Sequence, residues 1–206
     1  SCAGAGHRVR LYERNGFPVQ GGASWVAGGM LAPYAEIEHM DARWIEAGLA
    51  GIDFWESFAN GRDIGYARGG SLLVAHRADA YILERFRGHV AQMSGAVQGL
   101  CEVDVLEPAL SARFKSGLYL CDEAQLHPEL AMAALVEALK VLGVDMLAQS
   151  ADVGALDADL VIDCRGMGCD DDGLRGVKGE LLIVRNDEFL LSRPVRLMHP
   201  RYPLYI

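Results

Sequence analysis

The sequence lacks a long apolar run, a cysteine pair and an excess of basic residues. No apolar stretch reaches about 18 residues, so no transmembrane helix is predicted. The five cysteines form an odd set without a C-x-x-C pair or a histidine at zinc-ligand spacing, which favours reduced thiols. A net charge of -9 argues against nucleic-acid binding, because a negative surface repels phosphates. We therefore expect a soluble, cytoplasmic protein with no membrane, nucleic-acid or metal partner.

Catalytic signatures built from side chains alone are also missing. Neither a Ser-His-Asp set nor a pair of catalytic carboxylates stands out. The consecutive acids at 170–172 cannot converge on one ion, and we interpret them as a solvated loop. His127 has the chemistry of a general base, but Pro128 beside it favours a position at the start of a helix. The 206 residues, 51% of them hydrophobic, are enough for one or two globular domains.

The most unusual segment runs from Gly21 to Pro33 and holds four glycines within nine positions. It shows neither the 3.6-residue period of a helix nor the alternation of a strand. Its Met30 and Leu31 argue against an ordinary surface loop. Paired glycines let a backbone approach something flat or bulky, which is either another strand or a cofactor.

Residues 8–13 alternate like a strand and end at Glu13. In a dinucleotide-binding βαβ unit, an acid at the tip of the second strand binds a ribose hydroxyl, and the phosphate-binding glycines lie about 20 residues upstream. That count places the glycines before residue 1, so we expect the sequence to begin within the first helix. Gly4-Ala5-Gly6 lacks a third glycine and a preceding strand, and we interpret it as a helix end.

Hydrophobic periodicity predicts helices and strands along the rest of the chain. Helices are expected over 41–59, from 79 onward, over 105–114 and over 128–142, and strands over 71–75, 117–121, 144–147, 159–163, 180–184, 195–199 and 203–206. The aromatic residues of the first helix are assigned to the core: Trp44, Trp55 and Phe58. The last strand stops within an apolar run, so both ends are expected to be breaks in a longer chain.

Residues 10–14 and 23–33 resemble the FAD-dependent D-amino-acid oxidase family, and within it the glycine oxidases of thiamine biosynthesis. Similar segments follow in the family's order at 122–128, 161–168, 176–180 and 199–206. Each motif is weak alone, but the ordered series spans the chain. With the element order, it implies an α/β fold. An FAD-binding Rossmann-like domain (1–66 and 122–176) would be interrupted by a mixed or antiparallel α+β substrate domain (67–121 and 177–206).

The resemblance implies FAD as the cofactor and assigns residues to its adenine end. Glu13 would bind the ribose, and Arg14 would lie beside it. Ala23 and Ser24 would meet the pyrophosphate. Val153 would contact the adenine.

The resemblance also assigns residues near the reacting ring. Gly28, Gly29 and Met30 would run along the isoalloxazine, where relatives often have Ala-Gly-Met. Gly166 would lie near the cofactor at a strand end. Tyr205 would contact the substrate carboxylate, with a plain aromatic in a strand as the alternative.

The implied reaction is FAD-dependent oxidative deamination of glycine or a small amino acid. The imine or 2-oxo acid, ammonia and hydrogen peroxide would form with dioxygen as acceptor, and the imine would supply thiazole synthesis for thiamine. A thiazole synthase pathway is thus an implied partner, and homo-oligomers are left open.

One departure concerns the carboxylate-binding arginine, which in the family belongs to a segment outside this sequence. We assign that role to none of Arg193, Arg196 and Arg201. As given, the chain is expected to hold FAD weakly and not to turn over. The alternatives are another FAD amine oxidoreductase of sarcosine, proline or D-amino-acid type, and a non-catalytic fragment.

Overall fold

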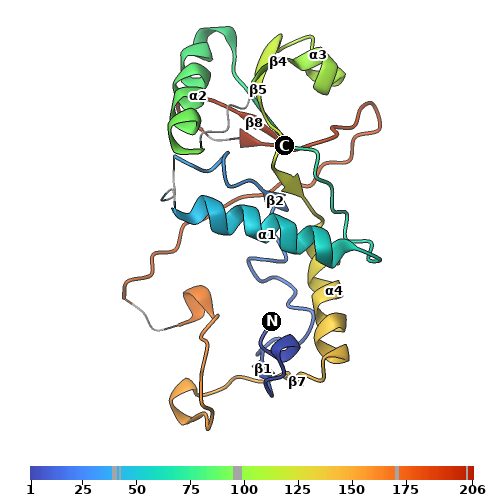
Figure 1. Ribbon diagram of the computed structural model, residues 1–206, viewed down its shortest axis with the longest axis vertical. Helices are drawn as coiled ribbons and strands as arrows, with labels where there is room; N and C mark the ends of the chain where they lie inside the picture. Colours follow the sequence, from blue (N-terminus) through green and yellow to red (C-terminus); the bar gives the residue numbers. More distant parts are fainter. Residues whose placement is uncertain (39–40, 42, 95–98, 170–171, 203) are drawn as a thin grey trace. The chain divides into compact units, whose positions relative to one another are not determined.

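The structure is a computed structural model that describes residues 1–206 except 39–40, 42, 95–98, 170–171 and 203. The chain forms two compact units, Ser1–Ala27 with Met132–Ile183 and Gly28–Ala131 with Val184–Ile206 (Figure 1). Residues 28–66 and 122–131, which the predicted FAD-binding domain includes, pack within the second unit. The limits of the functional domains stay a prediction, and the acidic loop at 170–172 lies partly outside the described residues.

The first unit contains a parallel strand pair. Strands β1 (Arg10–Tyr12) and β7 (Asp145–Leu147) pair in register, with Leu11 opposite Met146. Helix α4 (Pro128–Val141) precedes β7 and is followed by Gly143 at φ +70°. The helix over 128–142 and the strand over 144–147 were predicted from the pattern, and they are confirmed. Short 3-10 turns complete the unit: η1 (Ala3–Ala5), η4 (Val153–Ala155) and η5 (Gly166–Gly168).

Two predictions near the ends of η1 and α4 are also confirmed. Gly6 terminates η1 in the left-handed region at φ +88°, as expected for a helix end. His127 stands directly before α4, where its carbonyl accepts a hydrogen bond from the amide of Ala131 at 2.9 Å. Its position is therefore that of a helix-start residue.

Two predicted strands do not form. Residues 159–163 and 180–184 have no regular structure, and Ile183 is 89% exposed. Their apolar, β-branched composition is typical of buried parallel strands, but a strand also needs a neighbour that completes its hydrogen-bond ladder. Neither segment pairs with another strand among the described residues.

The second unit is built on a five-stranded sheet in the order β4-β5-β3-β8-β9. Its strands are β3 (Ser71–Val74), β4 (Leu100–Glu102), β5 (Ser116–Leu120), β8 (Val195–Leu197) and β9 (Leu204–Tyr205). Only β3 and β8 run parallel in this sheet, so the sheet is largely antiparallel, as predicted for the substrate domain, but the predicted strand at 180–184 is not part of it. The sequence did not predict β4 or the small antiparallel pair of β2 (Met30–Leu31) and β6 (Ala124–Gln125).

Helices flank this sheet in the second unit. Helix α1 (Arg43–Ala59) buries Ile45 and Ile52, which are seven residues apart and so lie on the same face of the helix, as an amphipathic helix requires. The expected burial of Trp44 was wrong: it is 55% exposed, because it lies beside Ile45 and outside the aliphatic stripe. Helix α2 (Ala80–Ser94) follows the turn η2 (Arg77–Asp79), and α3 (Val103–Leu106) with η3 (Pro108–Leu110) occupies the region expected to be one short helix.

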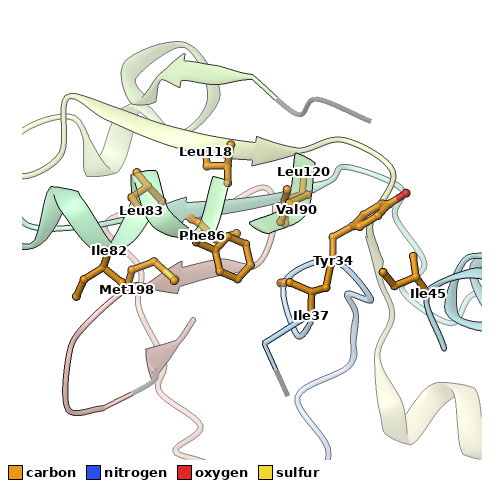
Figure 2. Packing of buried hydrophobic residues seen from close by; sticks show 12 residues of the cluster. Tyr34, Ile37, Ile45, Ile82, Leu83, Phe86, Val90, Leu118, Leu120 and Met198 are labelled. Carbon is orange, nitrogen blue, oxygen red and sulfur yellow. The ribbon is translucent and has the colours of Figure 1, made fainter. Parts of the chain in front are cut away.

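The core of the second unit covers both faces of the sheet. On one face, Phe86 of α2 lies at the centre of a cluster with Leu118 and Leu120 of β5 and with Tyr34 and Ile37 (Figure 2). A smaller cluster covers the other face: Leu72, Val74, Val103, Phe114 and Val195. Because side chains alternate across a strand, β3 contributes to both clusters. The segment 34–37 is thus held in the core although it has no regular structure.

A buried ion pair ties the end of α3 to the segment before β8. Arg193 Nε donates to Glu107 Oε1 at 2.9 Å, and the two side chains are 15% and 1% exposed. The other guanidinium nitrogens donate to the carbonyls of Gly69 and Leu106 at 2.6 and 3.4 Å. The guanidinium also lies 5.4 Å from the ring centre of Tyr119. Arg193 therefore works as an internal clamp.

We expect Arg193→Lys to lower the free energy of unfolding of the full-length protein by about 2 kcal/mol. An ammonium cannot reproduce the planar fork that reaches Glu107, Gly69 and Leu106 together. Urea unfolding followed by tryptophan fluorescence measures the change. Arg185→Lys is the control, since that side chain is 89% exposed. Equal free energies of unfolding for the two variants would contradict a stabilising role of the Arg193 contacts.

Candidate active site

The residues predicted for the adenine end lie in the first unit. Glu13 directly follows β1, and its amide donates to the carbonyl of Leu147 at 3.0 Å, extending the pairing with β7. Its Oε1 accepts from the amide of Asn15 at 3.0 Å, which fixes the carboxylate at the strand tip. Arg14 beside it is exposed. This is the carboxyl edge of a parallel pair, where open α/β sheets bind ligands.

Val153 comes six residues after β7. It lies in η4, where the carboxylate of Asp152 accepts from the amide of Gly154 at 3.0 Å. The side chain of Val153 is partly exposed. Glu13 and Val153 thus both follow paired strands on the same edge.

The other predicted residues of the first unit lie in exposed turns. Ala23 and Ser24 sit in a turn where the amides of Trp25 and Val26 donate to the carbonyl of Gly22 at 3.0 and 3.2 Å. Both are exposed.

Gly166 also lies in an exposed turn, η5, with φ +55°. Before it, the guanidinium of Arg165 contacts Asp163 at 2.6 Å and lowers the pKa of that carboxyl to about 2. Gly166 is therefore in a left-handed turn after a fixed ion pair.

The glycine pair of the ring-facing segment lies in the second unit, and its two members differ. Gly28 is exposed, and a Cβ there would meet nothing within 4 Å. Gly29 is buried at φ +77°, and a Cβ would lie 2.1 Å from the carbonyl oxygen of Leu126. Met30 then begins β2 opposite Gln125 of β6. Gly29 therefore packs closely against the backbone that directly follows β6, whereas Gly28 has open space beside it.

Glu123 anchors the segment that continues from β2. Its Oε1 accepts from the amides of Tyr34 and Ala35 at 2.8 and 2.7 Å, and the residue is 0% exposed. Burial raises the pKa of this carboxyl to about 7, although the two amides and Ser71 act in the opposite direction. The Ser71 hydroxyl and Glu123 Oε2 make no hydrogen bond of normal geometry. When Glu123 is protonated, its carboxyl group can donate a hydrogen bond to the Ser71 hydroxyl.

Tyr205 lies against the same segment. Its hydroxyl donates to Glu36 Oε1 at 2.6 Å, and burial together with this bond raises the pKa of the phenol to about 12. Arg196, opposite Tyr205 in the β8–β9 pair, is only 4% exposed and donates to the carbonyl of Ala35. The second unit thus joins the predicted ring-facing residues to the predicted substrate residue through the segment 30–36.

Two of the three arginines considered for the carboxylate, Arg193 and Arg196, are engaged in the fold. Arg196 lies 5.4 Å from the ring centre of Tyr205 and 3.8 Å from Glu38, with its Nε unpaired. Arg193 is the clamp described above, and Arg201 is exposed. Within the described ranges, no group of three His, Cys, Asp or Glu side chains gathers closely enough to hold a metal ion. No helix of that part of the chain is long and apolar enough to cross a membrane.

Sequence reasoning missed three residues that position the site: Glu36, Glu123 and Arg196. Glu123 stands next to Asp122, and nothing in the sequence separates the buried acid from its neighbour. Arg196 follows the alternation of β8, but a charged residue at that position reads as solvent-facing. The contacts of all three join segments more than 80 residues apart.

Residues 1–206 match the family described as FAD-dependent oxidoreductase (DAO). The chain belongs to this family. It is 40% identical over 205 residues to a Rhizobium etli protein with the provisional name thiamine biosynthesis oxidoreductase ThiO, covering 98% of this chain and 60% of the relative. It therefore spans about three-fifths of the length of that relative. The predicted family and α/β fold class are confirmed.

Solved structures support the same fold. Glycine oxidase from Geobacillus kaustophilus aligns with a TM-score of 0.59 and 22% identity, over 71% of this chain and 41% of that one. L-amino acid deaminase from Proteus myxofaciens aligns with a TM-score of 0.59 and 18% identity, over 76% of this chain and 36% of that one. L-proline dehydrogenase from P. horikoshii aligns with a TM-score of 0.56 and 13% identity, over 71% of this chain and 39% of that one. These likenesses establish the architecture, and their close TM-scores do not separate one substrate from another.

Proposed function

We propose that the full-length protein is an FAD-dependent oxidase of glycine or another small amino acid. It would release the imine or 2-oxo acid, ammonia and hydrogen peroxide, and would supply the imine for thiamine thiazole synthesis. The observation that carries the proposal is the second unit's connection of the Gly28–Met30 segment to Tyr205 within a DAO-family chain. The similarity to the ThiO protein of Rhizobium etli supports the thiamine role.

In this proposal the first unit would hold the adenine end of the cofactor. Glu13 has one oxygen held by Asn15, which leaves its second oxygen for a ribose hydroxyl. Arg14 and Val153 would flank the adenine, and the exposed turn of Ala23 and Ser24 would meet the pyrophosphate. When bound, FAD would supply the redox chemistry by which the electron pair of the substrate is transferred to dioxygen.

The ring end depends on backbone shape. The open space beside Gly28 suits a flat ring that approaches the backbone, and Gly29 and Met30 hold that backbone to β6. Gly166 would lie near the cofactor with its backbone exposed. Tyr205 would orient the substrate by a hydrogen bond to its carboxylate.

The visible absorption spectrum of the full-length protein tests this function. We expect oxidised-flavin bands that bleach when glycine is added without oxygen. Bleaching by sarcosine, proline or a D-amino acid, but not by glycine, would favour the other amine oxidoreductases. An L-proline dehydrogenase shares the fold at a similar TM-score, so the fold does not separate glycine from these other substrates. A colourless protein that takes up no added FAD would overturn the enzyme proposal in favour of a non-catalytic role.

Gly28→Ala tests the ring-facing segment separately. We expect the free energy of unfolding of the apoprotein to change by less than about 0.5 kcal/mol, because a Cβ there has open space. FAD affinity is expected to fall at least about tenfold, since the methyl group would occupy the approach to the ring. Fluorescence quenching of added FAD measures it. Unchanged affinity would remove Gly28 from the cofactor path.

A further inference from the structure

The hydroxyl of Tyr205 is already engaged by a carboxylate of the same chain. Its proton is donated to Glu36 Oε1 at 2.6 Å in a partly buried environment. A phenol has one proton to donate, and an ionised carboxylate can only accept. A second carboxylate therefore cannot receive the same hydrogen bond while Glu36 holds it.

Both partners of this bond are held in place by the fold. The backbone of Tyr205 pairs with Arg196, whose guanidinium packs 5.4 Å from the phenol ring centre. The backbone before Glu36 is fixed on both sides, because Ala35 donates its amide to Glu123 and accepts from Arg196 through its carbonyl. Release of the bond between Tyr205 and Glu36 therefore requires a rotation of the Glu36 side chain and no movement of the held backbone.

The charges around the phenol also oppose an incoming anion. Glu36 and Glu38 both raise the pKa of Tyr205, and Arg196 lowers it. Arg196 is itself 3.8 Å from Glu38 and buried under the ring, so its charge is shared within the cluster. An anion that reaches the hydroxyl therefore meets a like charge on Glu36.

We propose that Glu36 competes with the substrate carboxylate for the hydroxyl of Tyr205 and thereby sets the affinity for carboxylate-bearing substrates. The inference rests on the proposed role of Tyr205 in substrate binding. On binding, the substrate carboxylate displaces Glu36, whose side chain rotates away. Glu36 is a specificity-determining residue in this scheme, since ligands without a carboxylate do not require its displacement.

Acetate binding to the full-length, FAD-loaded protein tests the competition without turnover. Isothermal titration calorimetry is expected to show that Glu36→Gln lowers the dissociation constant of acetate about tenfold, because the competing bond loses its charge. The gain should disappear when Tyr205→Phe is combined with Glu36→Gln. Glu46→Gln is the control: it removes an exposed carboxylate from the first turn of α1 in the same unit, outside the cluster of Glu36, Glu38, Arg196 and Tyr205, and should change the constant less than twofold.

Three outcomes would overturn the inference. They are an acetate affinity that Glu36→Gln leaves within twofold of the wild type, the same gain in the Tyr205→Phe background, and no acetate binding in either protein. Failure of the proposed function is a separate result, because it is measured by flavin bleaching with amines. A protein that ignores every amine yet shows the Tyr205-dependent gain would keep the carboxylate site and lose the oxidase assignment.

Discussion

Gly29→Ala is expected to lower the free energy of unfolding of the full-length protein by about 3 kcal/mol or more. The left-handed φ of +77° disfavours any side chain, and the added Cβ would lie 2.1 Å from the backbone oxygen of Leu126. Relief requires β2 to move away from β6, which breaks the bond from the amide of Leu126 to the carbonyl of Gly29. Urea unfolding of the apoprotein measures the loss.

The neighbouring glycine is a matched control for this change. Gly28→Ala adds the same methyl group one residue earlier, where φ is not positive and nothing lies within 4 Å. If both variants lose the same free energy of unfolding, the loss comes from replacing any glycine of this segment, and the close packing of Gly29 is not its cause. If Gly29→Ala alone loses stability, any loss of flavin in that variant follows from a displaced segment.

Glu123 is expected to make the wild-type protein less stable as pH rises from about 4.5 to about 7. Burial raises the folded-state pKa of this carboxyl to about 7 from the ordinary value of 4.5. Between these values the folded state binds more protons than the unfolded state, so the free energy of unfolding falls with rising pH. The loss is about 3 kcal/mol, and it is complete above pH 7.

Glu123→Gln should remove this loss. The amide oxygen of glutamine can still accept from the amides of Tyr34 and Ala35, and its NH2 can donate to Ser71 without burying a charge. We expect the stability of the variant relative to the wild type to increase by about 3 kcal/mol between pH 4.5 and pH 8. Urea unfolding at half-unit pH steps gives the difference curve.

Asp122→Asn serves as the control for this experiment. It changes the adjacent, partly exposed carboxyl and leaves Glu123 in place. A similar difference curve for Asp122→Asn would contradict the assignment to burial of Glu123. A flat curve for Glu123→Gln would show that the two amides and Ser71 offset the cost of burying the charge.

Local patterns in the sequence were enough for much of the fold. The aliphatic period of α1, the glycine after α4 and the strand ending at Glu13 each depend on residues close together in the chain. The order of motifs was enough for the family, which the match over residues 1–206 confirms. The strands at 159–163 and 180–184 were predicted wrongly. An apolar run indicates that a segment is suited to burial, but it does not indicate whether a partner strand is present to complete the hydrogen bonds.

The candidate site divides in the same way. Sequence motifs were enough to propose Gly28, Gly29, Met30 and Tyr205 as site residues. They did not distinguish the environment of Gly28 from that of Gly29. Only the tertiary structure shows that Gly29 packs against Leu126 while Gly28 stays open.

By itself, the sequence determined the family, the α/β class and the segments where chemistry is expected, because these follow from local composition and motif order. The tertiary structure decided which polar groups those segments meet. Glu123 reaches Tyr34 across 89 residues, and Glu36 reaches Tyr205 across 169. Such contacts set the protonation of a buried carboxyl and the availability of a hydroxyl, and they depend on chain folding that no local pattern encodes.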